Sequence, residues 1–117
     1  MSEEIFDLNE FMERVQDDKE LLLELIGIYL EDYVGKRKGL EVAVETKNAE
    51  EVRNIAHSLK GSSGNISAKT LRELFWKLED MGKNGNLSQA KDVLSKVDLA
   101  FADFSKRITN LKSELGL

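Results

Sequence analysis

The chain has 117 residues, a length that suits one compact domain and is short for two. It contains no Cys and no Pro and carries a formal net charge of -5. The lack of Cys excludes disulfides, thiolate nucleophiles and Cys-based zinc sites, and the acidic charge disfavours nucleic acid as the main partner. We therefore expect a single domain over residues 1–117 that needs no metal and binds no nucleic acid.

The sequence shows no sign of secretion or membrane insertion. Its first ten residues, MSEEIFDLNE, lack the basic and apolar regions of a signal peptide. The longest apolar run, Leu21 to Leu30, is interrupted by Glu24. These features predict a soluble, cytoplasmic protein without a membrane partner.

Apolar residues recur at helical spacing in five consecutive segments, and a capping residue opens each of the last four. The expected elements are a short helix from Asp7 or Leu8 to Val15, a long helix from a cap at Asp17 to 46–48, a third from Asn48 through Ile66, a fourth from a cap at Ser67 to a turn at 82–86, and a last from Ser88 to Leu115. Four long helices joined by short turns favour an all-α fold, an antiparallel up-down four-helix bundle with a short extra N-terminal helix.

Two apolar features could serve association rather than folding. The last helix has an unbroken alternation of four and three residues, which is also the pattern of a homodimeric coiled coil. Burial within one chain is favoured, because the other helices offer complementary stripes and association costs free energy. Trp76 lies off the apolar stripe of its helix, and we interpret it as a partly exposed aromatic packed on a neighbouring helix rather than a binding anchor.

The only histidine, His57, falls on the third expected helix, opposite its apolar stripe. At about 100° per residue, Ile55, Leu59 and Ile66 lie about 160° to 200° away from His57. A histidine satisfied within the core would lie on or beside that stripe. We therefore expect His57 to face solvent.

Three further residues share the face of His57. Lys60 lies about 60° away, Gly61 about 40° away and Gly64 within about 20°. Each Gly inside a helix costs about 0.5 to 1 kcal/mol relative to Ala, so two on one exposed face need a reason. Without a Cβ beside it, His57 is open to close approach by another protein. An idle surface histidine and a merely solvated Lys60 remain the alternatives.

An exposed imidazole with a lysine one turn later is suited to carrying a phosphoryl group. Near neutral pH much of an ordinary histidine has a free ring lone pair, which is a nucleophile. The Lys60 ammonium could offset the charge of a phosphoryl group on the ring. The sequence shows no G-x-x-x-x-G-K-[ST] phosphate loop, so we expect the chain to receive the group from a partner rather than from ATP.

One region carries a recognisable motif. It reads IAHSLKGSSGNI over residues 55–66, and Ala68, Leu71 and the pair Leu78-Glu79 follow before a Gly-rich turn. The A-H-x-L-K-G core, set on a helix of a four-helix bundle, strongly resembles the histidine-containing phosphotransfer domain family. Ser67 departs from the pattern, because many members have Gly there, and we expect it to alter only the helix junction as a cap.

The resemblance implies roles for individual residues. His57 would be phosphorylated, Lys60 would be its charge partner, and Gly61 and Gly64 would be small positions that admit the partner's active site. The partners would be receiver domains of response regulators or hybrid histidine kinases, which would bring their own aspartate and magnesium ion, while this chain would need no cofactor. Specificity is expected in exposed residues near His57, namely Glu50, Arg53 and Asn54.

Three alternatives remain open from the sequence. The first is the phospho-accepting domain of a chemotaxis-type kinase, which is similar around the histidine but belongs to a much longer chain. The second is a helical adaptor in which His57 is incidental. The third, a hydrolase or metal enzyme, has too few convergent ligands with one His and no Cys. The sequence leaves open the cognate kinase and regulator, the direction of phosphoryl flow, the oligomeric state, and whether the chain is free-standing or part of a larger kinase.

Overall fold

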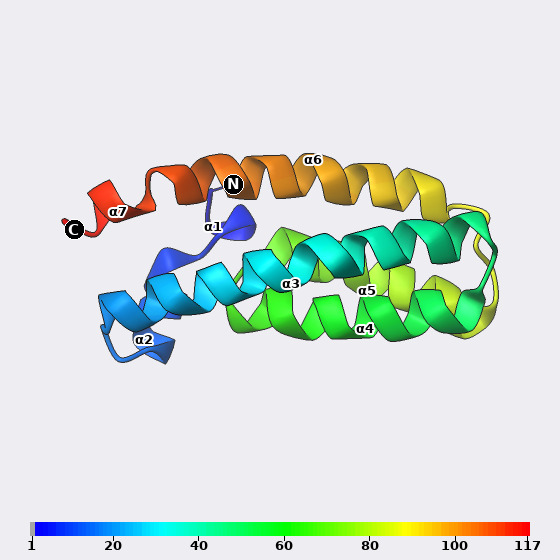
Figure 1. Cartoon of the computed structure of the whole chain (residues 1–117), viewed down its shortest axis with the longest axis horizontal. Helices are drawn as coiled ribbons and strands as arrows, with labels where there is room; N and C mark the ends of the chain where they lie inside the picture. The colour runs from blue at the N-terminus through cyan, green and yellow to red at the C-terminus, as the bar shows by residue number, and fades with distance from the viewer. Residues whose placement is uncertain (1) are drawn as a thin grey trace.

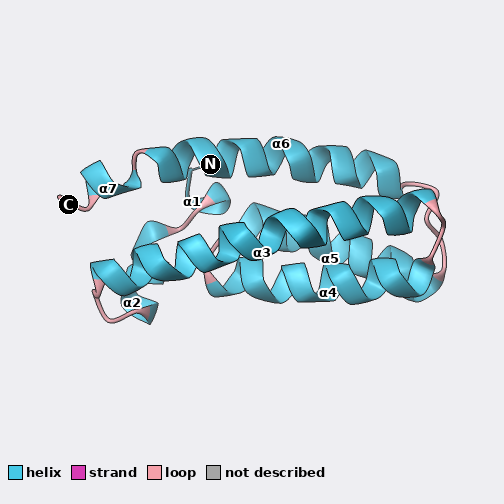
Figure 2. Cartoon of the chain, viewed as in Figure 1, coloured by secondary structure: helices cyan, strands magenta, loops and turns pink. Residues whose placement is uncertain are grey.

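The computed structural model describes residues 2–117 as helices joined by short turns, and Met1, the first residue of the predicted single domain, lies outside the described residues (Figure 2). No strand occurs in this part of the chain. The helices are α1 (Ser2–Ile5), α2 (Leu8–Arg14), α3 (Lys19–Glu45), α4 (Ala49–Asn65), α5 (Lys69–Asn84), α6 (Ala90–Thr109) and α7 (Leu111–Glu114). The all-α prediction is confirmed.

The four long helices, α3 to α6, form an antiparallel bundle, and the structure as a whole is elongated, with extents of 45 × 20 × 20 Å. In Figure 1, α4 and α6 lie at opposite edges of the view, with α3 in front of α5. Each long helix packs against its neighbours in the chain, α4 and α5 most extensively, and α3 also contacts α6. The predicted up-down bundle with a short N-terminal helix is thus the observed arrangement, with the single turn α1 added before α2.

Polar caps fix where the first helices begin. The side chains of Asp7, Asp18 and Asn48 accept hydrogen bonds from backbone N–H groups three residues later, at the starts of α2, α3 and α4. The predicted cap at Asp17 was one residue early, because Asp17 itself has a positive φ of 63° in the turn. The predicted cap at Ser88 was also wrong: its hydroxyl donates to Asn86 inside the turn, and α6 begins after Gln89.

Aromatic rings join the helices in one continuous core. Tyr33 of α3 stacks on Phe101 of α6 with ring centroids 3.8 Å apart. Phe104 makes edge contacts with Phe6, which precedes α2, and with Tyr29 of α3. The apolar stripe of α6 is part of this core cluster. It is therefore not free to form a coiled coil with a second chain.

The last predicted helix does not run unbroken to its end. It stops at Thr109, and the short helix α7 follows after Asn110. The change of direction buries Leu111 and Leu115, and the carbonyl of Leu115 accepts a hydrogen bond of 2.8 Å from Lys19 at the start of α3. The apolar spacing had correctly marked these leucines as core residues, but burial against the bundle end replaced helical continuity.

The register between α4 and α5 is set by a close backbone contact at Gly82. A Cβ on Gly82 would lie 2.6 Å from the backbone nitrogen of Arg53 and 2.7 Å from the carbonyl oxygen of Ala49. Only glycine allows two helices to approach so closely. One turn further along the same antiparallel pair, Glu79 of α5 comes to lie beside His57 of α4.

Candidate functional site

His57 stands near the middle of α4 on the side turned away from the core. Its side chain is 68% exposed, whereas Val52, Ala56 and Leu59 of the same helix are fully buried against the bundle. The predicted exposure of His57 is therefore confirmed. Because the helix turns Val52 and Leu59 to the face opposite His57, the same pattern that anchors α4 presents the imidazole to solvent.

One carboxylate connects the histidine to the lysine. Oε2 of Glu79 lies 2.8 Å from Nδ1 of His57, and Oε1 lies 2.6 Å from Nζ of Lys60. The Glu79 side chain is only 16% exposed, so both contacts are partly shielded from water. The structure thereby brings His57 and Lys60 together through a third residue to which the sequence reasoning had assigned no role.

The charge state of Glu79 decides what the imidazole can do. Burial alone would raise the pKa of the Glu79 carboxyl, but hydrogen bonds from Lys60 and His57 outweigh it and hold that pKa below its ordinary value. An ionised carboxylate can only accept, so the proton of a neutral His57 ring is held on Nδ1. The lone pair then lies on Nε2, the ring nitrogen that Glu79 does not contact and that is available as a nucleophile.

The two glycines of the predicted face differ in their surroundings. A Cβ on Gly61 would meet nothing within 4 Å, so the space over this position is open. A Cβ on Gly64 would lie 3.1 Å from Cδ of Arg72, a side chain of α5 that covers it in part. Gly61 is thus the open position beside His57, and Gly64 borders a neighbouring side chain.

The residues predicted to give specificity lie along α4 before His57. Glu50, Arg53 and Asn54 are all exposed and lie one to two turns N-terminal to the histidine. Glu50 and Asn54 line a small pocket of their own, together with Asn48 and Glu51. These side chains therefore form a stretch of surface continuous with the His57 face, and their role in specificity stays a prediction.

Ser67 does not cap α5 as predicted. It adopts a left-handed φ of 62°, and α5 starts after Ala68 without a side-chain cap. A residue in this conformation cannot direct its hydroxyl to the next helix start; the Ser67 hydroxyl instead donates 2.7 Å to Glu10 of α2. Its carbonyl accepts from the backbone of Asp7, so the junction is tied to the N-terminal segment.

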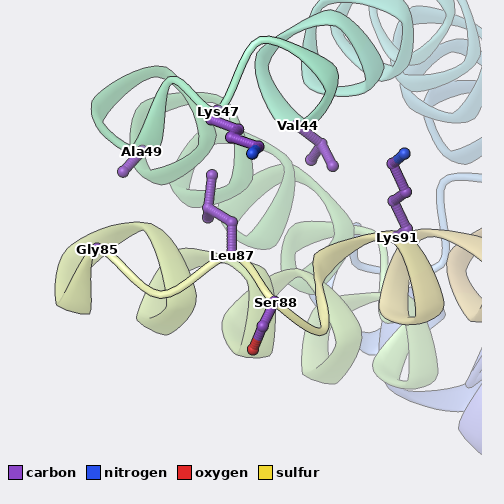
Figure 3. Close-up of a pocket in the computed structure, with 7 residues that line it drawn as sticks. All are labelled: Val44, Lys47, Ala49, Gly85, Leu87, Ser88 and Lys91. Carbon is purple, nitrogen blue, oxygen red and sulfur yellow. The ribbon is translucent and has the colours of Figure 1, made fainter.

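Other surface features lie apart from the His57 site. The pocket in Figure 3, about 420 Å³, is lined by Leu87 and other residues around the turns that join α3 to α4 and α5 to α6. Lys47 and Lys91 extend on either side of Val44 there, and the pocket shares no residue with the His57 cluster. Over residues 2–117, no group of three or more metal-ligating side chains occurs, and no helix is long and apolar enough to cross a membrane.

The fold agrees with the comparisons with known proteins. Residues 8–114 match the family model for the Hpt domain. Comparison with curated protein sequences gives no match. The chain superimposes on the crystal structure of histidine-containing phosphotransfer protein B (HptB) from Pseudomonas aeruginosa PAO1 with a TM-score of 0.86 and 21% sequence identity, covering 94% of this chain and 96% of that chain.

The family match extends over nearly the whole chain, and the chain belongs to the Hpt-domain family. It is therefore a phosphotransfer intermediate of phosphorelay, two-component signalling, and it works with the kinase and receiver partners of such relays. The resemblance indicated by the motif around His57 is confirmed.

Proposed function

We propose that His57 carries the phosphoryl group on Nε2 and exchanges it with aspartates of receiver domains, in response regulators or hybrid histidine kinases. The observation that carries this proposal is the contact of 2.8 Å between Glu79 and Nδ1. It leaves Nε2 as the nucleophilic nitrogen of a side chain that is largely exposed to solvent. The Hpt family match supports the same role.

The transfer step is a displacement at phosphorus that needs no cofactor in this chain. The Nε2 lone pair attacks the phosphorus of a partner's aspartyl phosphate, a P–N bond forms, and the P–O bond breaks as the carboxylate leaves with its electron pair. The Glu79 carboxylate stabilises the positive charge that develops on the ring, because it accepts the hydrogen bond from the Nδ1 N–H group. In the reverse direction an aspartate carboxylate attacks phosphorus, and the ring leaves with the electron pair.

Lys60 is proposed as the charge partner of the phosphoryl group. Its side chain is 29% exposed and its ammonium lies 2.6 Å from Glu79, so it is held at the site before phosphorylation. An ammonium has three donors, so the ion pair with Glu79 still leaves donors for phosphoryl oxygens. The partner's magnesium ion is expected to supply the remaining positive charge during transfer.

We expect this chain to have no ATP site and no cofactor of its own. We also expect no nucleic-acid or membrane partner, because the chain carries a net charge of -5. We place its action in the cytoplasm, where kinases draw the phosphoryl group from ATP. The direction of net flow follows from the partners and not from this site, since the step is reversible.

The test is transfer from a panel of receiver domains phosphorylated with a radioactive label. After incubation the chain is separated and its label is treated with acid, which hydrolyses phosphohistidine and spares phosphoserine. Acid-labile label on this chain is the expected result. A broad panel in which no receiver delivers label would contradict the proposal and favour the helical adaptor, in which His57 is incidental.

Gly61→Ala is expected to stabilise the fold while it slows transfer. The new Cβ meets nothing in this chain, so the helix should gain about 0.5 to 1 kcal/mol in free energy of unfolding. The same methyl would stand between His57 and the partner. Thermal unfolding and the rate of transfer are measured on one sample, and a stabilised variant with an unchanged rate would show that the partner does not approach over Gly61.

Glu79→Gln is expected to slow transfer about tenfold or more, because an amide can accept from Nδ1 but cannot neutralise the developing ring charge. Its effect on stability should depend on pH. The pKa of Glu79 is lowered in the folded state, so its contribution is present above the unfolded pKa and is lost as pH falls through the folded pKa. Urea unfolding of wild type and Glu79→Gln at pH 7 and at pH 3 checks this. If wild type is more stable by the same free energy of unfolding at both pH values, the lowered pKa of Glu79 is contradicted.

A further inference from the structure

A pocket with a cationic rim adjoins the proposed phosphoryl site on one side. It has a volume of about 490 Å³ and is formed where α2 and α5 flank the second half of α4. Lys60 and Gly61 line both this pocket and the face of His57. A protein seated over His57 would therefore cover the pocket as well.

The charge of the pocket is opposite to that of the whole chain. Arg14, Lys60 and Arg72 line it, and none of the described residues that line it is acidic. The chain as a whole has 22 acidic and 17 basic residues. Each cation already pairs with a carboxylate beside the pocket: Arg14 with Glu10, Lys60 with Glu79 and Arg72 with Glu73. The pairs of Arg14 and Arg72 are exposed and therefore weak, so these two guanidinium groups can bind carboxylates of a second protein instead.

Trp76 gives the pocket an apolar wall that the fold itself does not use. The indole is 52% exposed, whereas Leu74, Phe75 and Leu78 of the same helix are buried. The antiparallel register places it across from Lys60, as it places Arg72 across from Gly64. Exposed tryptophan beside arginine is the composition of residues that dominate binding energy in protein interfaces.

We propose that Trp76 and Arg72 form a docking pocket for the receiver domain, in which the indole packs on an apolar side chain and the guanidinium pairs with carboxylates of the partner. The inference rests on the proposed function, since it takes the receiver as the occupant. It assigns recognition to α5, in addition to the residues of α4 before His57. It also revises the interpretation of Trp76 as an aromatic that only packs on a neighbouring helix.

Arg72 and Trp76 are the useful probes because both side chains are about half exposed. The guanidinium of Arg72 pairs with the adjacent Glu73, and both side chains are about half exposed. Arg14 is less suitable, because it donates to the carbonyl oxygens of Gly64 and Asn65 and closes the end of α4. Controls of the same type lie on α6, the helix opposite α4: Leu99→Ala for an exposed apolar side chain and Lys96→Glu for a charge reversal.

The experiment times transfer from the phosphorylated chain to the receiver domain that exchanges label fastest with wild type. Each variant is first loaded with phosphoramidate, a donor too small to need docking, and equal amounts of loaded protein are compared. The half-saturating receiver concentration should rise about tenfold or more for Trp76→Ala and for Arg72→Glu, with the rate at saturation much less affected. Leu99→Ala and Lys96→Glu should match wild type.

The outcomes separate the two proposals. A wild-type chain that neither loads nor transfers refutes the proposed function. Normal wild-type transfer with unchanged half-saturation in both pocket variants overturns the docking pocket alone. An equal defect in the α6 controls also overturns it, because the effect would then not be local. Trp76→Phe, which keeps an aromatic wall, should recover most of the affinity lost in Trp76→Ala.

Discussion

His57→Gln is expected to remove all acid-labile label from the chain while the fold is unchanged. The glutamine has no nucleophilic ring nitrogen, so no P–N bond can form. Its amide can still donate to the Glu79 carboxylate, which keeps the partner of Lys60 in place. Because the side chain is exposed, we expect the free energy of unfolding to change by less than about 0.5 kcal/mol.

The measurement combines the label assay with far-UV circular dichroism and urea unfolding. Full labelling of the variant would mean that the phosphoryl group is carried by another residue. Loss of label together with loss of helical structure would mean that His57 stabilises the bundle, contrary to its exposure. Loss of label in a normally folded protein is the outcome that the site geometry requires.

Gly82→Ala is expected to destabilise the bundle strongly, although it adds only one methyl group. The new Cβ would lie 2.6 to 2.9 Å from backbone atoms of α4, which cannot rotate away as a side chain can. Separation of α4 from α5 would disturb their extensive contact, and we expect a loss of about 3 kcal/mol or more. That is a large share of the roughly 5–15 kcal/mol that holds a domain of this size together.

Gly35→Ala is the matched control for this prediction. Gly35 lies within α3, and a Cβ there would meet nothing within 4 Å. The same substitution should therefore raise the free energy of unfolding by about 0.5 to 1 kcal/mol, because alanine is the better helix former. Urea unfolding of both variants tests the argument, and a Gly82→Ala protein as stable as Gly35→Ala would contradict the close contact.

The parts of the molecule that depend on local sequence could be predicted. Helical periodicity and capping residues indicated the bundle, and the angular position of His57 relative to its apolar stripe indicated the exposed site. The motif around His57 identified the family. Each of these inferences uses residues within one or two turns of each other, where helix geometry alone fixes the relative positions.

The role of Glu79 could not be predicted in the same way. It lies on a different helix from His57, and its contact depends on the register between α4 and α5. That register is set by the close approach at Gly82, which looks in the sequence like one more glycine of a turn. The pair Leu78-Glu79 was recognisable as part of the family pattern, but only the packed structure shows that its carboxylate holds the imidazole.

The departures at the helix ends have a similar cause. Ser67 was predicted as a cap from its residue type. In the structure the N-terminal segment packs on this turn, and the Ser67 hydroxyl donates to Glu10 instead. The predicted helix through Leu115 was interrupted because burial of Leu111 against the bundle replaced straight continuation. In both places a tertiary contact with a distant segment overrode the local preference.

The proposed role of Glu79 is to hold the Nδ1 proton of His57 so that the phosphoryl group is carried on Nε2. It is tested most directly by NMR of the phosphorylated chain with ¹⁵N-labelled histidine, since coupling to ³¹P identifies the nitrogen that is bonded to phosphorus. We expect coupling to ³¹P at Nε2 and a proton on Nδ1. Phosphorus on Nδ1, or phosphorylated protein with no P–N coupling at His57, would contradict it.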